Sequence, residues 1–178
     1  MKIRMLIERG VFRFFNQQLL IQSAIMNNRD ELLSKIEILQ KQVRLPLFPG
    51  ATPLEIERLL LISKRRLGIC PPIDYLEFLK IHDGLTVEGI FFYSTTLLAD
   101  APEEKGLSFI LMNVAHRELE WKSDYIFLGD DDLDVFIFNT KSLKYEVRDK
   151  QSLDNLFEDF DSFSKLLDHI LQRIEDRI

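Results

Sequence analysis

The side chains that most often carry enzyme chemistry or bind metals are few in this sequence. The three histidines are His82, His116 and His169. None belongs to an H-E-x-x-H motif or to another spacing typical of zinc ligands. Each lies in or near a segment that is expected to be helical. We therefore predict structural or solvated roles for all three, and no bound metal.

The single cysteine, Cys70, has no partner for an internal disulfide, which is typical of a cytoplasmic protein. It could act as a nucleophile if a nearby base or a helix N-terminus activated its thiol. A helix is expected to begin beside it, but a free cysteine more often behaves as a small apolar residue. We predict that Cys70 is buried and not catalytic.

An aspartate-rich run is the most distinctive polar motif, and its members are Asp130, Asp131, Asp132 and Asp134. Oxygen side chains at positions 1, 3 and 5 of this run match the start of an EF-hand calcium loop. However, Val135 occupies the place of the turn glycine, and Lys141 that of the bidentate glutamate. Strands rather than helices are also expected on both sides. The run therefore predicts a solvated turn and no metal or other cofactor.

Negative charge is concentrated around this run. Between Glu118 and Asp161 there are 13 acidic and 5 basic residues, a net charge of −8. Such a segment could create a negative field that attracts a basic protein. The open alternative is a set of solvated turns that only increase solubility. On the first interpretation, the candidate partner-binding residues are Asp130, Asp131, Asp132 and Asp134.

Motifs that bind phosphate or support catalysis are missing. The formal net charge of −6 argues against nucleic acid as a partner, because such binding relies on Lys and Arg. The only basic run, Lys64-Arg65-Arg66, lies in an expected amphipathic helix and is predicted to be a solvated face. The sequence has neither a glycine-rich phosphate loop nor a G-x-S-x-G motif. We therefore predict that the protein is not an enzyme.

The chain is long enough for one domain with a sizeable core. It has 178 residues, 46% of them hydrophobic, and 14 phenylalanines indicate an aromatic-rich core. Residues 1–25 match neither a signal peptide nor a membrane-spanning helix, because Arg9, Arg13 and polar residues interrupt them. They are either an N-terminal extension or the result of an over-long gene prediction, with Met26 as the true start. The domain is predicted to span residues 26–178.

Apolar spacing and helix-breaking residues predict several helices. Helical spacing first appears at residues 27–43. A second helix is expected after Thr52, which forms a capping box with Glu55, and Gly68 is placed to end it. A short helix around Tyr75, a helix over residues 108–120 and a final helix from about residue 162 complete the set.

Strand patterns occupy the middle of the chain. Val87–Tyr93 is expected to form one strand, and residues 101–106 an exposed loop. Three more strands are expected at Tyr125–Leu128, Leu133–Phe138 and Lys144–Arg148. Short turn-like links join these three, which predicts an antiparallel meander.

The last of these strands alternates apolar residues with Glu146 and Arg148, so one face is predicted to meet water. Helices before and after a central strand region give an α+β fold. We predict a single domain with N-terminal helices, a central and mainly antiparallel sheet, and a C-terminal helix.

Two stretches resemble the SUKH superfamily, which includes the yeast cell-wall assembly regulator and many bacterial immunity proteins. The first runs from Leu67-Gly68 through Pro72–Leu79 to Gly84. It is similar to the family's Leu-Gly helix end, its Pro-x-x-Tyr-x-x-Phe-Leu helix and the glycine turn that follows. Pro71 departs from the family pattern, in which Leu often precedes the proline.

The second stretch begins with Tyr125–Asp130 and continues through Val135–Asn139 to Tyr145–Val147. It resembles the family's glycine-ended strand and the hairpin after it. The final helix, from Ser162-Phe163, is also similar, so the resemblance covers roughly residues 52–171.

This resemblance implies that the protein binds another protein and catalyses no reaction. Bacterial members of the superfamily commonly neutralise toxins of polymorphic or contact-dependent systems, many of them nucleases. The family has no common active site, so no catalytic residues carry over. We predict a cytoplasmic immunity protein with a basic toxin domain as its partner. The alternative is a general scaffold or regulatory interaction domain without a toxin partner.

Overall fold

The structure is a computed structural model, and it describes residues 34–39, 41–42, 49–97, 107–117 and 124–178. The chain divides into two compact units, Met1–Ile38 and Leu39–Ile178. In the first unit, residues 34–38 are helical, in agreement with the spacing of residues 27–43. The predicted extension 1–25, the predicted start Met26 and the expected loop 101–106 lie outside the described residues.

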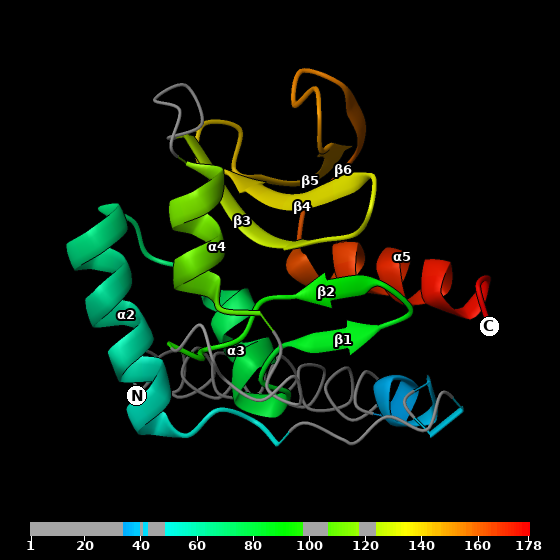
Figure 1. Cartoon of the computed structure of the whole chain (residues 1–178), viewed down its shortest axis with the longest axis horizontal. Helices are drawn as coiled ribbons and strands as arrows, with labels where there is room; N and C mark the ends of the chain where they lie inside the picture. Colours follow the sequence, from blue (N-terminus) through cyan, green and yellow to red (C-terminus); the bar gives the residue numbers. More distant parts are fainter. Residues whose placement is uncertain (1–33, 40, 43–48, 98–106, 118–123) are drawn as a thin grey trace, which may run out of the picture. The chain divides into compact units, whose positions relative to one another are not determined.

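A six-stranded antiparallel sheet forms the centre of the second unit (Figure 1). Each strand pairs with its neighbour in the sequence, so the strand order in the sheet is the chain order. The strands are β1 (Leu85–Val87), β2 (Ile90–Phe92), β3 (Tyr125–Asp130), β4 (Asp134–Asn139), β5 (Lys144–Asp149) and β6 (Leu156–Phe160). The predicted meander of three strands is confirmed, and it continues on both sides.

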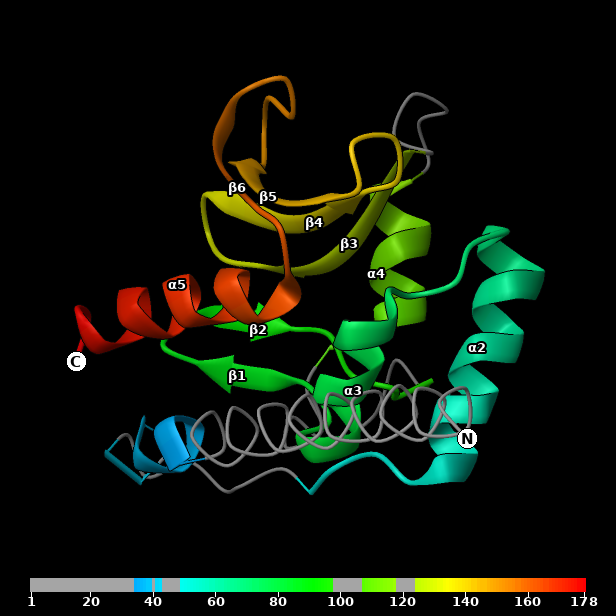
Figure 2. The same ribbon diagram turned by 180° about the vertical axis from the view of Figure 1, so that it is seen from behind.

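The labelled helices are α2 (Pro53–Leu67), α3 (Ile73–Ile81), α4 (Phe109–His116) and α5 (Phe163–Glu175). α5 contacts β5, β6 and α3, whereas α4 contacts β3, and α2 contacts α3 and α4. Figure 2 shows α2 and α5 on opposite sides of this unit, with α3 between them. The α+β fold class is therefore confirmed. Within the described residues, no helix is long and apolar enough to span a membrane.

The start of α2 has the predicted capping box. The Thr52 side chain accepts a hydrogen bond from the Glu55 backbone N–H, and the Glu55 carboxylate accepts one from the Thr52 N–H (2.8 Å). These bonds satisfy two of the amide groups that a helix start leaves unpaired. Gly68 ends α2 in the left-handed conformation (φ 70°), as its position in the sequence predicts.

Tyr75 connects α3 to the sheet. Its buried ring meets the ring of Phe163, at the start of α5, edge to face at a centroid distance of 5.0 Å. The Tyr75 hydroxyl bonds to the carbonyl oxygens of Leu128 (3.0 Å) and Tyr93. Because a buried hydroxyl is costly without a partner, these two bonds determine where α3 lies on β3.

β2 and β3 approach closely at Gly129 and then separate. A Cβ atom at Gly129 would lie 2.2 Å from the Phe91 carbonyl oxygen, so only glycine fits there. Further along β3, the Asn113 side chain on α4 donates to the Phe127 carbonyl (2.7 Å) and accepts from the Phe127 N–H (3.0 Å). The amide therefore supplies the two bonds that a neighbouring strand would otherwise make.

Two strand predictions are corrected. Val87–Tyr93 is not one strand, because the chain reverses at Glu88 and Gly89, which both have positive φ (47° and 73°), between β1 and β2. The strand β6 was not predicted at all.

Two burial predictions are also wrong. Glu146 is buried rather than facing water, because it accepts hydrogen bonds from Asn139 (3.0 Å) and pairs with Arg148 (2.6 Å). Cys70 is exposed rather than buried, since it lies in the short link between α2 and α3.

We expect Tyr75→Phe to lower the free energy of unfolding by about 1–3 kcal/mol, because it removes the hydroxyl from two buried carbonyl groups. Urea denaturation followed by circular dichroism would measure the change. Tyr125→Phe is the matched control, since Tyr125 is only half-buried. An equal loss in both variants would contradict the assigned role of the Tyr75 hydroxyl.

Candidate partner-binding site at the turn end of the sheet

Three turns gather at one end of the sheet because consecutive antiparallel strands reverse alternately at its two ends. They are the β1–β2 turn (88–89), the β3–β4 turn (131–133) and the β5–β6 turn (150–155). Hydrogen bonds also bring the last residues of α5 to this end. We call this region, with Arg173 of α5 and Arg177 just after it, the turn end. The aspartates singled out by the sequence lie in it.

Asp131 is the central residue of the turn end. Its Oδ1 accepts hydrogen bonds from the backbone N–H groups of Leu133 (3.0 Å) and Asp134 (2.8 Å). Its Oδ2 accepts from the guanidinium groups of Arg173 (2.8 Å) and Arg177 (2.9 Å). The residue is only 2% exposed. All four bonds favour the charged carboxylate.

The pKa of Asp131 is set by two opposing effects, its burial and its hydrogen-bonded and charged partners. Burial alone raises the pKa, because it penalises the charged form. The N–H groups of Asp134 and Leu133 and the charges of Arg173 and Arg177 lower it by more, so the pKa lies below its ordinary value. The carboxylate is therefore ionised at neutral pH and held in one orientation.

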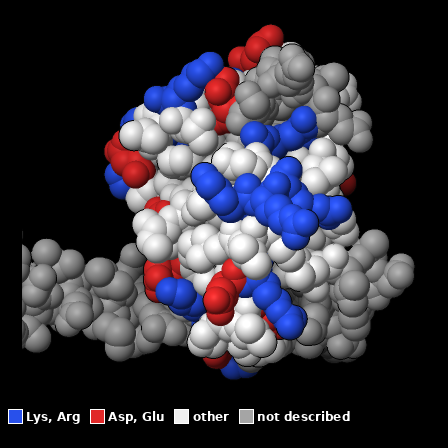
Figure 3. Space-filling view, turned by 90° about the vertical axis from the view of Figure 1, so that its left-hand side faces the viewer, with Lys and Arg blue, Asp and Glu red and all other residues white. Residues whose placement is uncertain are grey.

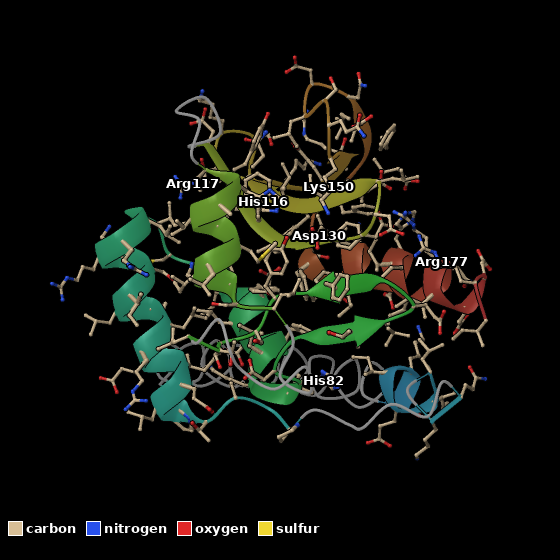
Figure 4. All side chains as sticks on the ribbon, viewed as in Figure 1. His82, His116, Arg117, Asp130, Lys150 and Arg177 are labelled. Atoms are coloured by element: carbon tan, nitrogen blue, oxygen red, sulfur yellow. The ribbon has the colours of Figure 1, made fainter. Side chains whose placement is uncertain are left out.

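Arg177 joins two of the turns. Besides its bond to Asp131, it donates to the backbone carbonyl of Glu88 in the β1–β2 turn (3.1 Å). Arg173, one helical turn earlier, also pairs with Asp134 (2.9 Å). The C-terminal part of α5 is thus fastened to both turns, and Figure 4 shows Arg177 at this end of the helix.

Lys150 connects the third turn to the same carboxylates. Its ammonium group pairs with Asp130 (2.7 Å) and donates to the Asp131 carbonyl (2.9 Å). Its backbone N–H donates to the carbonyl of Leu133 (2.8 Å). Asp130 is 3% exposed, so its charge is directed into the protein and towards Lys150.

The four predicted contact residues therefore differ in what they offer to a partner. Asp130 and Asp131 are buried, and Asp134 is half-buried and paired with Arg173. Only Asp132 is exposed, beside Leu133, whose side chain is 73% exposed. Three of the four carboxylates pair with Lys150, Arg173 and Arg177, so the turn carries much less negative charge than its sequence suggests. Contact with a partner stays a prediction for all four.

The sequence reasoning missed the three cations. Lys150 lies within the acidic segment, but nothing in its sequence context indicates which carboxylate it meets. Arg173 and Arg177 lie outside that segment, four residues apart, the first on the final helix and the second just after its end. In the sequence, that spacing would put both on one face of a continued helix, which is the one signal that could have suggested a shared partner.

The histidines are separated and take part in packing. The His82 imidazole is buried and bonds to the Gly84 carbonyl; burial lowers its pKa. His116 stacks on Phe127 (4.4 Å between ring centroids) and lies 3.2 Å from the Tyr93 hydroxyl. Figure 4 shows His82 and His116 apart from each other.

The third histidine, His169, lies 3.5 Å from Glu158, between α5 and β6. No group of three or more His, Cys, Asp or Glu residues in the described part of the chain could hold a metal ion. The geometry around the histidines therefore suits packing better than metal binding.

The basic run is on a different face. Lys64, Arg65 and Arg66 are exposed in the last turn of α2, where positive charge is favoured by the helix dipole. Figure 3 shows Lys and Arg side chains gathered on the side of the molecule that α2 occupies. This agrees with the predicted solvated face.

Comparisons with known proteins gave no match: no family model matches the chain, and no curated protein matches it. The SUKH resemblance therefore stays a prediction from the motifs alone.

We expect Asp131→Asn to lower the free energy of unfolding at pH 7 by about 2–3 kcal/mol, because it weakens charge-assisted bonds to a buried group. The folded-state pKa of Asp131 lies below the value of about 3.9 in the unfolded chain. The stabilisation is therefore present above about pH 4 and is lost as the pH falls through the folded pKa.

Urea denaturation at a series of pH values would measure this difference. Wild type should lose stability more steeply than Asp131→Asn below pH about 4. Asp132→Asn is the matched control, because Asp132 is exposed, and it should change the stability by less than about 0.5 kcal/mol. Equal pH profiles for wild type and Asp131→Asn would contradict this account.

Proposed function

We propose that this chain is a protein-binding module that neutralises a cognate toxin domain in the cytoplasm, with the turn end as part of its contact surface. The observation that carries the proposal is the turn end itself. The buried carboxylates of Asp130 and Asp131 pair there with Lys150, Arg173 and Arg177, and Arg177 also bonds to the β1–β2 turn, while Asp132 and Leu133 remain exposed.

Such a region suits binding because its shape is set before a partner arrives. Ordering flexible turns on binding costs free energy, and rigid contact groups avoid part of that cost. Leu133 offers an apolar contact, and Asp132 offers a charge beside it. An apolar centre with a polar rim is the usual anatomy of a protein interface.

The residues that carry the SUKH resemblance have structural roles in the fold, which supports a shared scaffold rather than a shared active site. Gly68 ends α2, and Gly84 adopts a positive φ (87°) before β1. Tyr75 ties α3 to the sheet, and Gly129 allows β2 to approach β3. In such a family, function depends on variable surface residues.

Binding is favoured over catalysis because the charged side chains buried in the described residues are already bonded within the fold. Asp130 pairs with Lys150, Asp131 with two arginines, and Glu146 with Arg148. These pairs occupy the three carboxylates without a substrate, although Oδ1 of Asp130 is buried without a hydrogen-bond partner in the described part of the chain. A catalytic group would need an accessible base or nucleophile with a partner that activates it.

The proposed partner is basic. Toxin domains that act on nucleic acid carry Lys and Arg to hold phosphates, and a protein of net charge −6 would associate with them faster at low ionic strength. The same charge disfavours direct binding of this chain to nucleic acid.

Co-expression with the product of the gene immediately upstream tests the proposal. We expect that product to be toxic on its own, this chain to restore growth, and the two to co-purify in a complex that salt weakens. A toxic neighbour that this chain fails to relieve would overturn the toxin role. A neighbour without toxicity would favour the general scaffold instead.

Within that complex, we expect Asp132→Lys to slow association with the toxin by up to about tenfold at low salt, since exposed charges act mainly on association rates. Surface plasmon resonance at two salt concentrations would measure the rates. Glu57→Lys makes a change of the same sign and size on the exposed face of α2 and serves as the control. Equal effects of both variants would show that Asp132 makes no specific contact.

A further inference from the structure

Among the described residues, the strand β6 has one edge with which no other strand pairs. It is the last strand of the sheet and pairs only with β5. Within the described residues, no backbone group of Leu156–Phe160 bonds to anything outside the sheet. Figures 1 and 2 both show β6 at the border of the sheet farthest from β1. Such an edge presents a row of backbone donors and acceptors that a further strand can use.

The exposure of β6 distinguishes it from the strand at the other border. β1 has three residues, of which Leu85 and Val87 are each 1% exposed. In β6, Leu156 is 44% and Phe157 56% exposed, and Glu158 and Asp159 are exposed as well. β6 is therefore the border strand whose side chains are accessible to a partner.

The charge of β6 is uniformly negative. Residues 154–161 contain four carboxylates and no Lys or Arg. Lys144 lies 3.4 Å from Asp159 and also pairs with Asp161, and His169 lies 3.5 Å from Glu158. The side chains of Glu158 and Asp159 nevertheless stay 52% and 49% exposed, so both can accept a further cation.

The register of β6 places these two carboxylates on different faces. Glu158 lies opposite Val147 of β5, and Asp159 lies opposite Glu146. Because neighbouring residues of a strand point to opposite faces, a strand added to β6 would meet one carboxylate on each of its own faces. Opposite charges in directly facing positions stabilise a strand pair.

We infer that β6 is a docking edge for an extended, basic segment of the partner protein, which adds to the sheet as a seventh strand. Backbone hydrogen bonds hold the segment, its Lys or Arg residues meet Glu158 and Asp159, and Leu156 and Phe157 supply apolar contact. This inference rests on the proposed binding function, because it names the form in which the basic partner is recognised.

A second copy of this chain fits the edge less well. Antiparallel pairing of β6 with itself would place Glu158 and Asp159 opposite or diagonal to the same residues of the other copy. Like charges in such positions destabilise a strand pair. The charge of the edge thus favours a basic partner over self-association, and it also protects the free protein from edge-to-edge aggregation.

The first test uses the full chain labelled with ¹⁵N and a synthetic peptide in which Lys-Lys and Val-Val pairs alternate, so that an added strand carries Lys on both of its faces. We expect the amide resonances of residues 156–160 to shift on titration. Hydrogen exchange should slow about tenfold at alternate residues of β6, whose N–H groups point away from β5 and are covered by the new strand. A peptide in which Glu replaces Lys should leave them unchanged. Absence of shifts at β6 with the basic peptide, or shifts confined to other residues, would overturn the inference.

Charge variants make the test specific to the edge. We expect the double variant Glu158→Lys, Asp159→Lys to weaken peptide binding at least about tenfold, since each facing charge pair reverses sign. The double variant Glu57→Lys, Glu175→Lys changes the net charge equally at exposed positions outside the sheet and should change the affinity less than about twofold. Equal weakening by both variants would mean non-specific attraction and overturn the inference. If the lysine variant does not fold, Glu158→Gln with Asp159→Asn provides the same comparison.

Two combinations of experimental results distinguish a failure of this inference from a failure of the proposed toxin-neutralising role. If the basic peptide adds to β6 but the neighbouring gene product is not toxic, the result supports β6 as a docking edge and contradicts the toxin-neutralising role. Suppose instead that the chain and its Glu158→Lys, Asp159→Lys variant restore growth equally, and that the amide hydrogens of residues 156–160 exchange as fast in the complex as in the free chain. This result would support the toxin-neutralising role and contradict β6 as a docking edge.

Discussion

The buried carboxylate of Asp131 is the interaction on which the arrangement of one end of the molecule depends. A buried charge is tolerated only with partners, and Asp131 obtains them from its own turn and from α5. The position of α5 is therefore coupled to the β3–β4 turn, and through Arg177 also to the β1–β2 turn. At the other end of α5, the Phe163 N–H donates to Asp74 of α3 (3.0 Å). Polar bonds thus fix both ends of the helix, while its apolar face fills the core between them.

The acidic segment shows why local charge in a sequence is a poor measure of charge on a surface. Counting from Glu118 to Asp161 gives a strongly negative segment. In the fold, Arg173 of α5 and Arg177 just after that helix come from beyond the segment, and Lys150 pairs with Asp130. Much of the negative charge is used inside the protein to hold its turns together. Of the carboxylates that remain open to solvent, Asp132 is the neighbour of Asp131 in the same turn, whereas Glu158 lies on β6.

The sequence was sufficient to predict those elements that depend on residues close together in the chain. The capping box at Thr52 and the apolar stripe of α5 depend on residues within a few positions of each other, and both predictions are confirmed. The failures involve contacts that the residue pattern does not identify: Glu146 is buried, with Asn139 on the neighbouring strand and Arg148 as its hydrogen-bonding partners. β6 was missed because its side chains are mostly exposed, so it lacks the alternation of apolar and polar residues that marks a half-buried strand. The acidic run was found, but the cations that define its role came from outside it.

Meander topology links the two surfaces described above. Because each strand pairs with its chain neighbour, the three turns must meet at one end, and the last strand must have an open edge. The β5–β6 turn belongs to the turn end and leads directly into Leu156, so the rigid tip and the open edge are continuous. To reach the edge of β6, a partner that meets Asp132 and Leu133 would pass the end of β5 and the β5–β6 turn, which also belongs to the turn end. In this arrangement the turn end provides contact groups of fixed shape, and the edge of β6 provides backbone groups for hydrogen bonds. A partner that used both would gain preorganised side-chain contacts from the first and strand pairing from the second.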